Sequence, residues 1–201
     1  MAILDNILAS CIPFVPKALM RPLSVRYIAG ESRADALVRG DHLREKSYTT
    51  TFDLLGEAVT NSSEIDAAAG EYKLLIQTLI DNDFPVNVSL KPTQMGLDIS
   101  RNTCFDTVNS IVSLAQQQHG FVRFEMEESN TIDGTLAVFE RLREAHQQHV
   151  GCVLQAMLFR THHDATRLLE TNPQQLNVRM VKGIYVEPAA IAYQEMNEIN
   201  K

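Results

Sequence analysis

The sequence Val178-Arg-Met-Val-Lys-Gly-Ile-Tyr-Val-Glu-Pro188 combines a short apolar run with two permanent cations. The run ends at Gly183 and Pro188 follows soon after, an order that predicts a buried strand whose carboxyl end opens into a loop. Burying Arg179 and Lys182 without anionic partners would cost free energy. We therefore expect either an anionic ligand at this strand end or acids on neighbouring strands that pair with both cations.

The composition excludes several classes of protein. The chain has 201 residues, 45% of them hydrophobic, which is enough for a large core in one or two domains. Its net charge of -7, without a long basic stretch, argues against a nucleic-acid partner. Three widely spaced cysteines form no CxxC motif, so neither a zinc site nor a disulfide framework is expected. No transmembrane run of about 18 apolar residues and no signal-peptide pattern is found, and we expect a cytoplasmic protein.

From residue 49 to residue 201 the chain repeats one unit, made of a short apolar strand, a polar loop and an amphipathic helix. Residues 1–48 lack strand alternation, and their helical spacing, interrupted by proline and glycine, predicts an N-terminal helical arm. The expected strands are 50–55, 86–90, 121–126, 152–156 and 178–182. The expected helices are about 63–82, about 104–118 and about 131–147, one opened by Thr161 with Asp164, and one begun by Pro188.

Two of these helices carry a capping-box pattern at their predicted starts. Ser63 is followed by Asp66, and Thr103 is followed by Asp106, so each pair offers an oxygen to the free backbone N–H groups of a first turn. Gly120 is the predicted end of the second helix. The boundaries of these helices therefore follow from their expected caps.

Five successive strand-helix units predict parallel strands joined by right-handed crossovers. A doubly wound sheet is covered by helices on both faces and needs apolar residues on both, whereas the inner face of a barrel can be polar toward its mouth. One face of each predicted strand is polar, with Asp53 and Glu57, then Asn87, Ser89 and Lys91, then Arg123, Glu125 and Glu127, then Gln155, then Arg179. The predicted fold is therefore α/β, a partial (βα)8 TIM-type barrel of about five units behind the helical arm.

The polar residues gather at the carboxyl ends of the predicted strands, where barrels of this kind place their active sites. Because Arg179 and Lys182 are three residues apart, a bulge or a strand end near Lys182 is needed to bring both to the site. The amines of Lys91 and Lys182 leave a Schiff-base enzyme of the aldolase type open. No metal is expected, because the histidine pairs lack acids or cysteines at ligand spacing. No serine or cysteine nucleophile elbow is present.

Five stretches, in order along the chain, resemble the strand motifs of the proline dehydrogenase family. They are Phe52-Asp-Leu-Leu-Gly-Glu-Ala-Val-Thr60, Val88-Ser-Leu-Lys-Pro-Thr-Gln-Met-Gly-Leu-Asp98, Phe121-Val-Arg-Phe-Glu-Met-Glu-Glu-Ser129, Val150-Gly-Cys-Val-Leu-Gln-Ala156 and Val178-Arg-Met-Val-Lys-Gly-Ile-Tyr185. The resemblance implies a distorted (βα)8 barrel that binds FAD and oxidises L-proline to 1-pyrroline-5-carboxylate, the first step of proline breakdown to glutamate. The electrons pass on to a quinone or another acceptor, and contact with a membrane is expected only for that transfer.

The resemblance also implies roles for individual residues. Arg179 would lie beside the reactive edge of the flavin, with Gln155, Lys182 and Gly183 as further cofactor contacts. Lys91 would bind the proline carboxylate and Tyr185 would line the proline pocket. The catalytic set is Arg179, Lys91, Glu125 and Glu57, with Glu57 as a gating acid. A fixed guanidinium near a flavin that gains negative charge on reduction is the expected electrostatic arrangement.

The chain departs from the family pattern in two ways. Glu125 stands where the family usually has aspartate, which adds one methylene group. The family has further flavin contacts on later strands and a tyrosine and two arginines that clamp proline on its last helix, whereas this sequence stops at Lys201. We expect a fragment of a longer protein, and the alternative is a truncated, flavin-free remnant. Unpaired sheet edges would make the isolated chain associate or aggregate.

Overall fold

The computed structural model describes residues 28–56, 58–171 and 173–200. The chain divides into two compact units, Met1–Thr50 and Thr51–Lys201. In the described part of the first unit, helix α3 (Arg33–Arg44) begins with a capping box between Ser32 and Asp35. The rest of the predicted helical arm, residues 1–27, lies outside the described residues.

The second unit contains a parallel sheet in which the order of the strands in space is their order in the sequence. The strands are β1 (Phe52–Asp53), β2 (Asn87–Leu90), β3 (Phe121–Phe124), β4 (Val150–Gln155) and β5 (Val178–Val181), and every neighbouring pair is parallel. An order without any crossover to the far side is that of a singly wound sheet, which curves toward a barrel.

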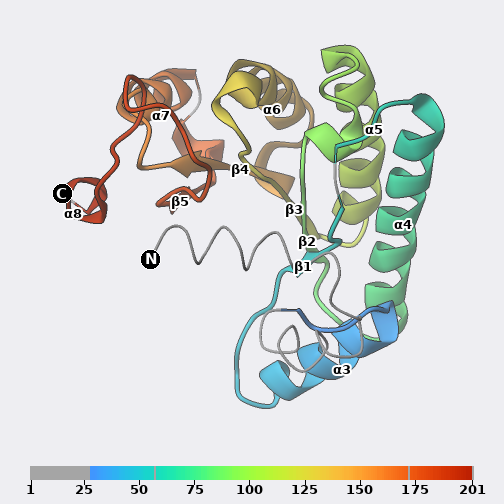
Figure 1. The fold of residues 1–201 in the computed structure, drawn as a ribbon. Coiled ribbons are helices and arrows are strands. Elements are labelled where there is room, and N and C mark those ends of the chain that lie inside the picture. The colour runs from blue at the N-terminus through green and yellow to red at the C-terminus, as the bar shows by residue number, and fades with distance from the viewer. Residues whose placement is uncertain (1–27, 57, 172, 201) are drawn as a thin grey trace, which may run out of the picture. The chain divides into compact units, whose positions relative to one another are not determined.

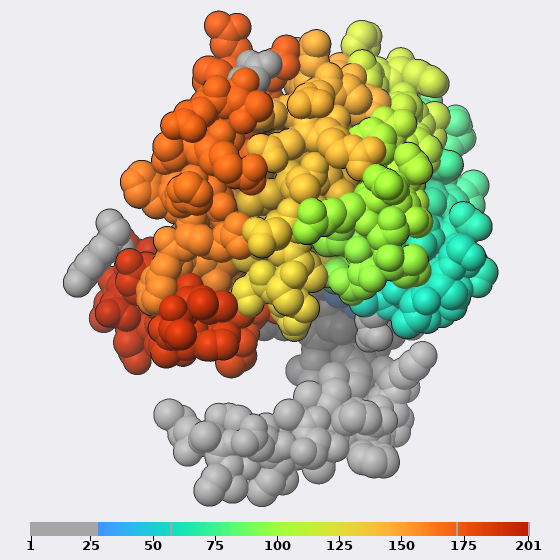
Figure 2. Space-filling view, turned by 90° about the horizontal axis from the view of Figure 1, so that it is seen from above, coloured from blue at the N-terminus to red at the C-terminus, as the bar shows by residue number. Residues whose placement is uncertain are grey.

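The helices of the second unit cover one side of this sheet (Figure 1). They are α4 (Ser62–Asp81), α5 (Arg101–Gln116), α6 (Ile132–His146) and α7 (Thr161–Thr171), with the short α8 (Met196–Ile199) near the end. Single 3₁₀ turns are η2 (Thr93–Met95), η3 (Ser129–Thr131), η4 (Gln147–His149) and η5 (Pro173–Gln175). Figure 2 shows the colours of α4, α5, α6 and α7 following one another across this outer layer. The expected α/β fold, a partial TIM-type barrel, is confirmed.

The hydrophobic core lies between the outer face of the sheet and these helices. Val88, Leu90, Val122 and Phe124, which alternate with the polar residues of β2 and β3, are fully buried. Burial of such side chains contributes about 1.5 to 3 kcal/mol each. The helices therefore take the apolar side of each strand, and the polar side is left to face the interior of the barrel.

Two helix starts lie earlier than the sequence analysis predicted. Helix α4 is capped by Asn61, whose side chain accepts from the backbone N–H of Glu64, so the pattern at Ser63 is not its cap. Helix α5 is capped by Ser100, and Thr103 is already inside the helix. In both places a residue with a suitable side-chain oxygen occurs first along the chain, and it takes the cap.

The helix predicted to begin at Pro188 is wrong. The backbone N–H groups of Ile191 and Ala192 do bond the Pro188 carbonyl, at 3.0 and 3.2 Å, but the turn stops there. The next backbone N–H, that of Tyr193, donates instead to the carbonyl of Met157 at 2.8 Å. Hydrogen bonds to the loop after β4 thus replace the bonds that a continuing helix would need.

Candidate functional site

Arg123 of β3 forms hydrogen bonds with Asn177, which directly precedes β5. Nη1 of Arg123 donates to the backbone carbonyl of Asn177 at 3.2 Å, and Nη2 donates to the Asn177 side-chain oxygen at 2.7 Å. A Cβ atom on Gly151, the register partner of Arg123, would overlap the guanidinium. Arg123 therefore joins β3 to the start of β5, and the candidate site lies toward the other end of the strands.

Glu125 and Arg179 form an ion pair across β4. The register joins Phe124 to Cys152 and Val153 to Arg179, so one further residue along β3 brings Glu125 beside Val153. Nη2 of Arg179 donates to Oε1 of Glu125. Its other N–H groups have no partner among the residues that the structure describes, and 43% of the side chain is exposed. An acid partner for Arg179 is one of the two alternatives expected from the sequence, and the ion pair with Glu125 still leaves other donors of Arg179 free for a ligand.

Lys91 and Asp53 lie at the ends of the first two strands. The Lys91 ammonium donates to the carbonyl of Gly56 at 3.2 Å. The hydroxyl of the fully buried Tyr72 lies 2.8 Å from the Ser89 carbonyl and 3.3 Å from Asp53 Oδ1. Partial burial raises the pKa of the Asp53 carboxyl, and the charge of Lys91 opposes this rise. Asp53 and Lys91 are thus electrostatic neighbours on the inner side.

Glu127 connects the ends of three strands, although no role follows for it from the sequence. Its carboxylate, on a residue only 8% exposed, accepts from the backbone N–H and the hydroxyl of Thr93 at 2.9 and 2.8 Å. Its backbone carbonyl accepts from Nε2 of the buried Gln155 at 2.7 Å. Burial raises the pKa of Glu127, and the bonds from Thr93 and the charge of Lys91 act against this rise. Glu127 shares the polar face of the predicted third strand with Glu125, and this is the sequence pattern that could have identified it as a site residue.

The loop after β5 carries the remaining predicted residues. The strand ends at Val181, so the predicted strand end near Lys182 is confirmed. Lys182 is exposed, and its ammonium has no partner among the described residues. Gly183 has φ +106, and a Cβ there would overlap Met157. Burial raises the pKa of Tyr185, as do the charges of the acids Glu127, Glu128 and Glu125 that follow β3. Glu57 lies outside the described residues.

We call the five charged residues Asp53, Lys91, Glu125, Glu127 and Arg179 the mouth cluster. Together with the free ammonium of Lys182, this cluster presents three cations at the carboxyl ends of the strands. Such an arrangement can bind an anionic group and stabilise negative charge that develops on it. In the described part of the chain, no three His, Cys, Asp or Glu side chains gather as a metal site.

A family model described as proline dehydrogenase matches residues 36–198, most of the chain. The chain belongs to the proline dehydrogenase family. Proline dehydrogenase 1 of Bacillus subtilis is 30% identical over 168 residues, and the match covers 84% of this chain and 54% of that protein. Proline dehydrogenase of Deinococcus radiodurans is 31% identical, with 89% and 58% covered. The chain thus spans a little over half of these proline dehydrogenases.

Solved structures of family members share this fold. Proline utilization A from Bdellovibrio bacteriovorus, inactivated by N-propargylglycine, has a TM-score of 0.75 and 26% identity over 83% of this chain and 21% of that one. Proline utilization A from Corynebacterium freiburgense has a TM-score of 0.68 over 89% of this chain and 20% of that one. At 23% identity, the latter shows the fold alone. The family match does not favour the Schiff-base alternative.

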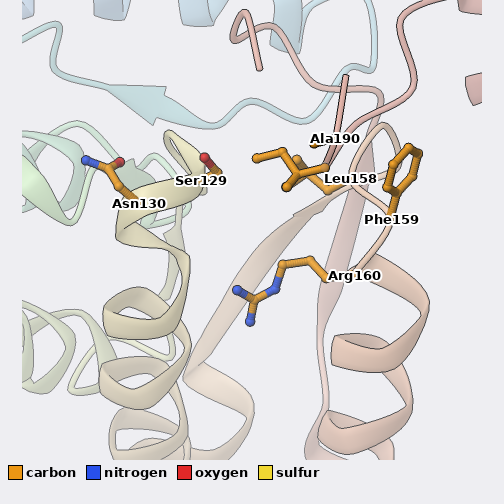
Figure 3. A pocket seen from close by; sticks show the side chains of 7 residues that line it. Ser129, Asn130, Leu158, Phe159, Arg160 and Ala190 are labelled. Atoms are coloured by element: carbon orange, nitrogen blue, oxygen red, sulfur yellow. The ribbon is translucent and has the colours of Figure 1, made fainter. Parts of the chain in front are cut away.

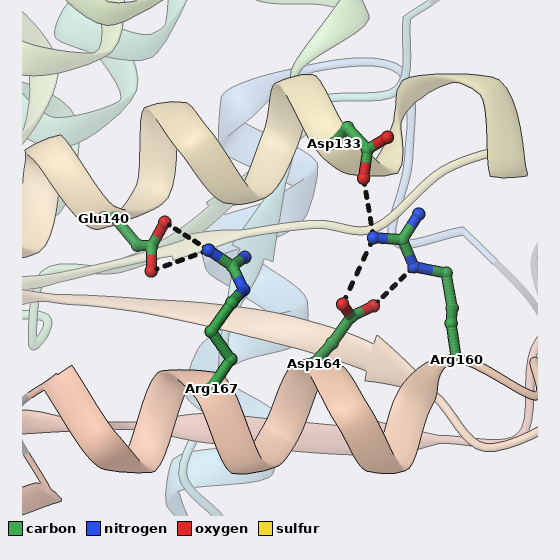
Figure 4. Close-up of polar contacts among 5 residues, drawn as sticks. All are labelled: Asp133, Glu140, Arg160, Asp164 and Arg167. Carbon is green, nitrogen blue, oxygen red and sulfur yellow. Dashed lines mark hydrogen bonds and ion pairs between the residues drawn. The ribbon is translucent and has the colours of Figure 1, made fainter.

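Outside the mouth, the charges of this family member are paired in a different way. Arg160, just before α7, bonds Asp133 of α6 at 2.6 Å and Asp164 of α7 at 2.6 Å, and Arg167 of α7 bonds Glu140 of α6 at 2.9 Å (Figure 4). We call these contacts the outer ion pairs. The hydrogen bond from Arg160 lowers the pKa of Asp133. The outer ion pairs hold α6 and α7 together.

Proposed function

We propose that this chain is part of an FAD-dependent proline dehydrogenase that oxidises L-proline to 1-pyrroline-5-carboxylate. The observation that supports the proposal is that Lys91 and Arg179 both lie near Asp53 at the carboxyl ends of the strands, in a member of this family. Among the described residues, no helix is long and apolar enough to cross a membrane. The electron acceptor is a quinone or another acceptor, and a peripheral membrane contact would serve only this electron transfer.

The residues present fit a flavin at this mouth. Arg179 has free N–H donors on a guanidinium that Glu125 holds in place, and Lys182 has a free ammonium. Gln155 is fixed by its bond to the Glu127 carbonyl, and Gly183 turns the chain close to β4. These four residues, Gln155, Arg179, Lys182 and Gly183, would hold the cofactor. FAD supplies the acceptor for the hydride of proline, and Arg179 stabilises the negative charge that results.

The other residues of the site act on proline. Lys91 binds its carboxylate as a charged hydrogen-bond donor, a contact worth about 1.5 to 3 kcal/mol. Tyr185 forms one wall of the pocket, and Glu57 closes it as a gating acid. Glu125 acts by holding Arg179 and by its own charge beside the reacting centre. Oxidation of the carbon–nitrogen bond removes a hydride and requires the amine to be deprotonated, so few further acids or bases are needed.

Cofactor binding is the direct test of this function. The purified protein is incubated with FAD, freed of excess, and examined for flavin absorbance and fluorescence quenching. We expect bound, non-covalent FAD, and Arg179→Met should lower its reduction potential because a nearby cation is lost. Arg167→Met, which removes a cation of the outer ion pairs, should leave the potential unchanged. A protein that cannot be loaded with FAD in any form would refute the proposal.

Proline oxidation is the second part of the test. We expect residues 1–201 alone to show no measurable oxidation of proline by an artificial electron acceptor, because β5 has no neighbour on its outer edge among the described strands and the family's further carboxylate ligands lie on later units. Supplying the remaining barrel units of a homologue should restore turnover. Activity of the chain alone would show that its own residues complete the carboxylate site.

A further inference from the structure

Glu187 connects the loop after β5 to the loop after β3. Its two carboxylate oxygens accept from Ser129, one from the backbone N–H at 2.7 Å and one from the hydroxyl at 2.6 Å. Glu187 is only 8% exposed. Two hydrogen bonds to a buried carboxylate are strong and directional. Because β4 lies between β3 and β5, this contact crosses the carboxyl end of β4. We call the Glu187–Ser129 contact the latch.

The segment between β5 and the latch has two different sides. Ile184 and Val186 are 87% and 101% exposed, whereas Tyr185 is half-buried and Glu187 is buried. Tyr185 and Glu187 are the less exposed residues of this segment, so both lie against the protein, whereas Ile184 and Val186 face solvent. Tyr185 also lies in the field of Glu125, Glu127 and Glu128, which immediately precede Ser129. The latch thus attaches this segment next to the place that Tyr185 faces.

The latch is needed because little else holds this part of the loop. Among the described residues, none forms a hydrogen bond with the backbone of residues 183–186. Within the loop, the Glu187 carbonyl accepts from Nε2 of Gln194 at 3.2 Å. Backbone bonds to the segment after β4 occur on either side, where the Lys182 carbonyl accepts from the N–H of Met157 at 2.9 Å and the Ile191 carbonyl accepts from the N–H of Phe159 at 3.0 Å. Figure 2 shows the red segment after β5 beside the yellow segment after β3.

A hollow lies beside the latch, so the loop and the start of α6 are not closely packed at this place. The hollow has a volume of about 370 Å³ and is lined by Ser129, Asn130, Leu158, Phe159, Arg160, Ala190 and Ile191 (Figure 3). Ser129 borders it on the side of α6, and Ala190 borders it on the side of the loop. The two segments are therefore not in close contact across the hollow, and beside it the Glu187 carboxylate connects them.

We propose that Glu187 is a positioning residue for the substrate pocket, which fixes residues 183–187 across the end of β4 and thereby places Tyr185. This role rests on the proposed function, because Tyr185 is the pocket wall of that function. The structural role of the latch can be tested separately from the proposed function. If the latch holds the loop, removing Glu187 or Ser129 should open the loop whether or not proline is the substrate.

The latch is tested first without any activity measurement. Glu187→Gln and Ser129→Ala are compared with Ser129→Thr, which keeps both donors, and with Glu195→Gln, which removes an exposed acid of the same loop. Chymotrypsin cleavage after Tyr185 should become at least about tenfold faster in the first two variants. The titration of Tyr185, isolated by subtracting a Tyr185→Phe background, should move toward the ordinary tyrosine value. Cleavage and titration unchanged in Glu187→Gln would overturn the latch.

The positioning role is tested in the form that oxidises proline. Glu187→Gln should raise KM for proline about tenfold or more and change kcat less, because the pocket wall moves while the cations of the mouth stay in place. Ser129→Thr, which keeps both hydrogen-bond donors to Glu187, should retain the wild-type KM. An opened loop with an unchanged KM would overturn the positioning role and leave the proposed function intact. If wild-type protein binds no FAD, the proposed function fails, while cleavage and titration still test the latch.

Discussion

The outer ion pairs and the mouth cluster use the same kinds of side chain in opposite ways. Between α6 and α7, the Arg160 guanidinium meets Asp133 and Asp164, and the pKa of Asp133 is lowered. At the mouth, burial raises the pKa of Asp53 and of Glu127, although Lys91 and Arg179 are close. The charged form is thus favoured by the fold in the first region and disfavoured in the second.

This difference separates a structural set of charges from a functional one. Paired charges on the outer layer contribute modestly to stability. The mouth cluster keeps buried acids that reduce stability at neutral pH, and it leaves cations without full partners. Groups with shifted pKa values that gather in a concave place are typical of sites that act on a ligand. The comparison can be tested by equivalent substitutions in both regions.

The largest contrast is expected between two arginines. In the form that oxidises proline, Arg179→Met should lower kcat/KM by about 10² to 10³, the usual effect of losing a group that stabilises developing charge. Arg167→Met, in the outer ion pairs, should change it less than about twofold. Steady-state kinetics with an artificial acceptor measure both. Similar losses in the two variants would mean that the mouth arginine is only structural.

Two glutamates give the next contrast. Glu125→Gln should lower turnover about tenfold or more, because its charged hydrogen bond with Arg179 is lost. Glu125→Asp should preserve or improve turnover, since it keeps the charge and restores the residue usual in the family. Glu140→Gln is the matched change in the outer ion pairs, and it should have almost no effect. Equal rates for the Asp, Gln and wild-type forms would place Glu125 outside the site.

The smallest expected effects are on the free energy of unfolding. Its dependence on pH should have opposite signs for an acid of the mouth cluster and for an acid of the outer ion pairs. Because burial raises the pKa of Glu127, its contribution to folding is complete below the ordinary glutamate pKa and is lost as the pH rises through the raised value. Relative to wild type, Glu127→Gln should therefore gain stability between about pH 4 and pH 7. Denaturant unfolding across this range measures the trend. A constant difference at every pH would argue against a strained Glu127.

Asp133 should show the reverse trend. Its lowered pKa gives a contribution that is present above the ordinary aspartate value and is lost as the pH falls through the lowered one. Because Asp133 is mostly exposed, Asp133→Asn should lose less than about 1 kcal/mol at pH 7 and nothing near pH 2. The same unfolding series gives this result. Parallel pH trends in the two variants would remove the distinction between the regions.

The sequence predicted the architecture because the periodicity of side chains records which face is covered. Alternation along β2 and β3 identified the faces that the helices bury, and the order of the strands followed from the repeated unit. The helix predicted after Pro188 failed because the hydrogen bonds that stop it come from the loop after β4, more than thirty residues earlier in the chain. Contacts of this kind leave no local pattern.

The candidate site was predictable only where strand parity applies. Lys91, Glu125, Gln155 and Arg179 were identified from their places on predicted strands, and their roles remain predictions. The bonds from Thr93 to Glu127 and from Ser129 to Glu187 join residues 34 and 58 positions apart. Their partners are fixed by the curvature of the sheet and by loop shape, which a single sequence does not encode in any simple spacing. The structure was needed to find these contacts.

Gly183 has a consequence for how variation in this protein is interpreted. With φ +106, and with the Met157 side chain where a Cβ would lie, the position disfavours every residue that has a Cβ. Any other amino acid at this position adds a side chain, so a substitution here strains the backbone whether or not the residue contacts a ligand. Invariance of this codon among relatives would therefore report a backbone requirement, and it could not by itself identify residue 183 as a contact for the cofactor.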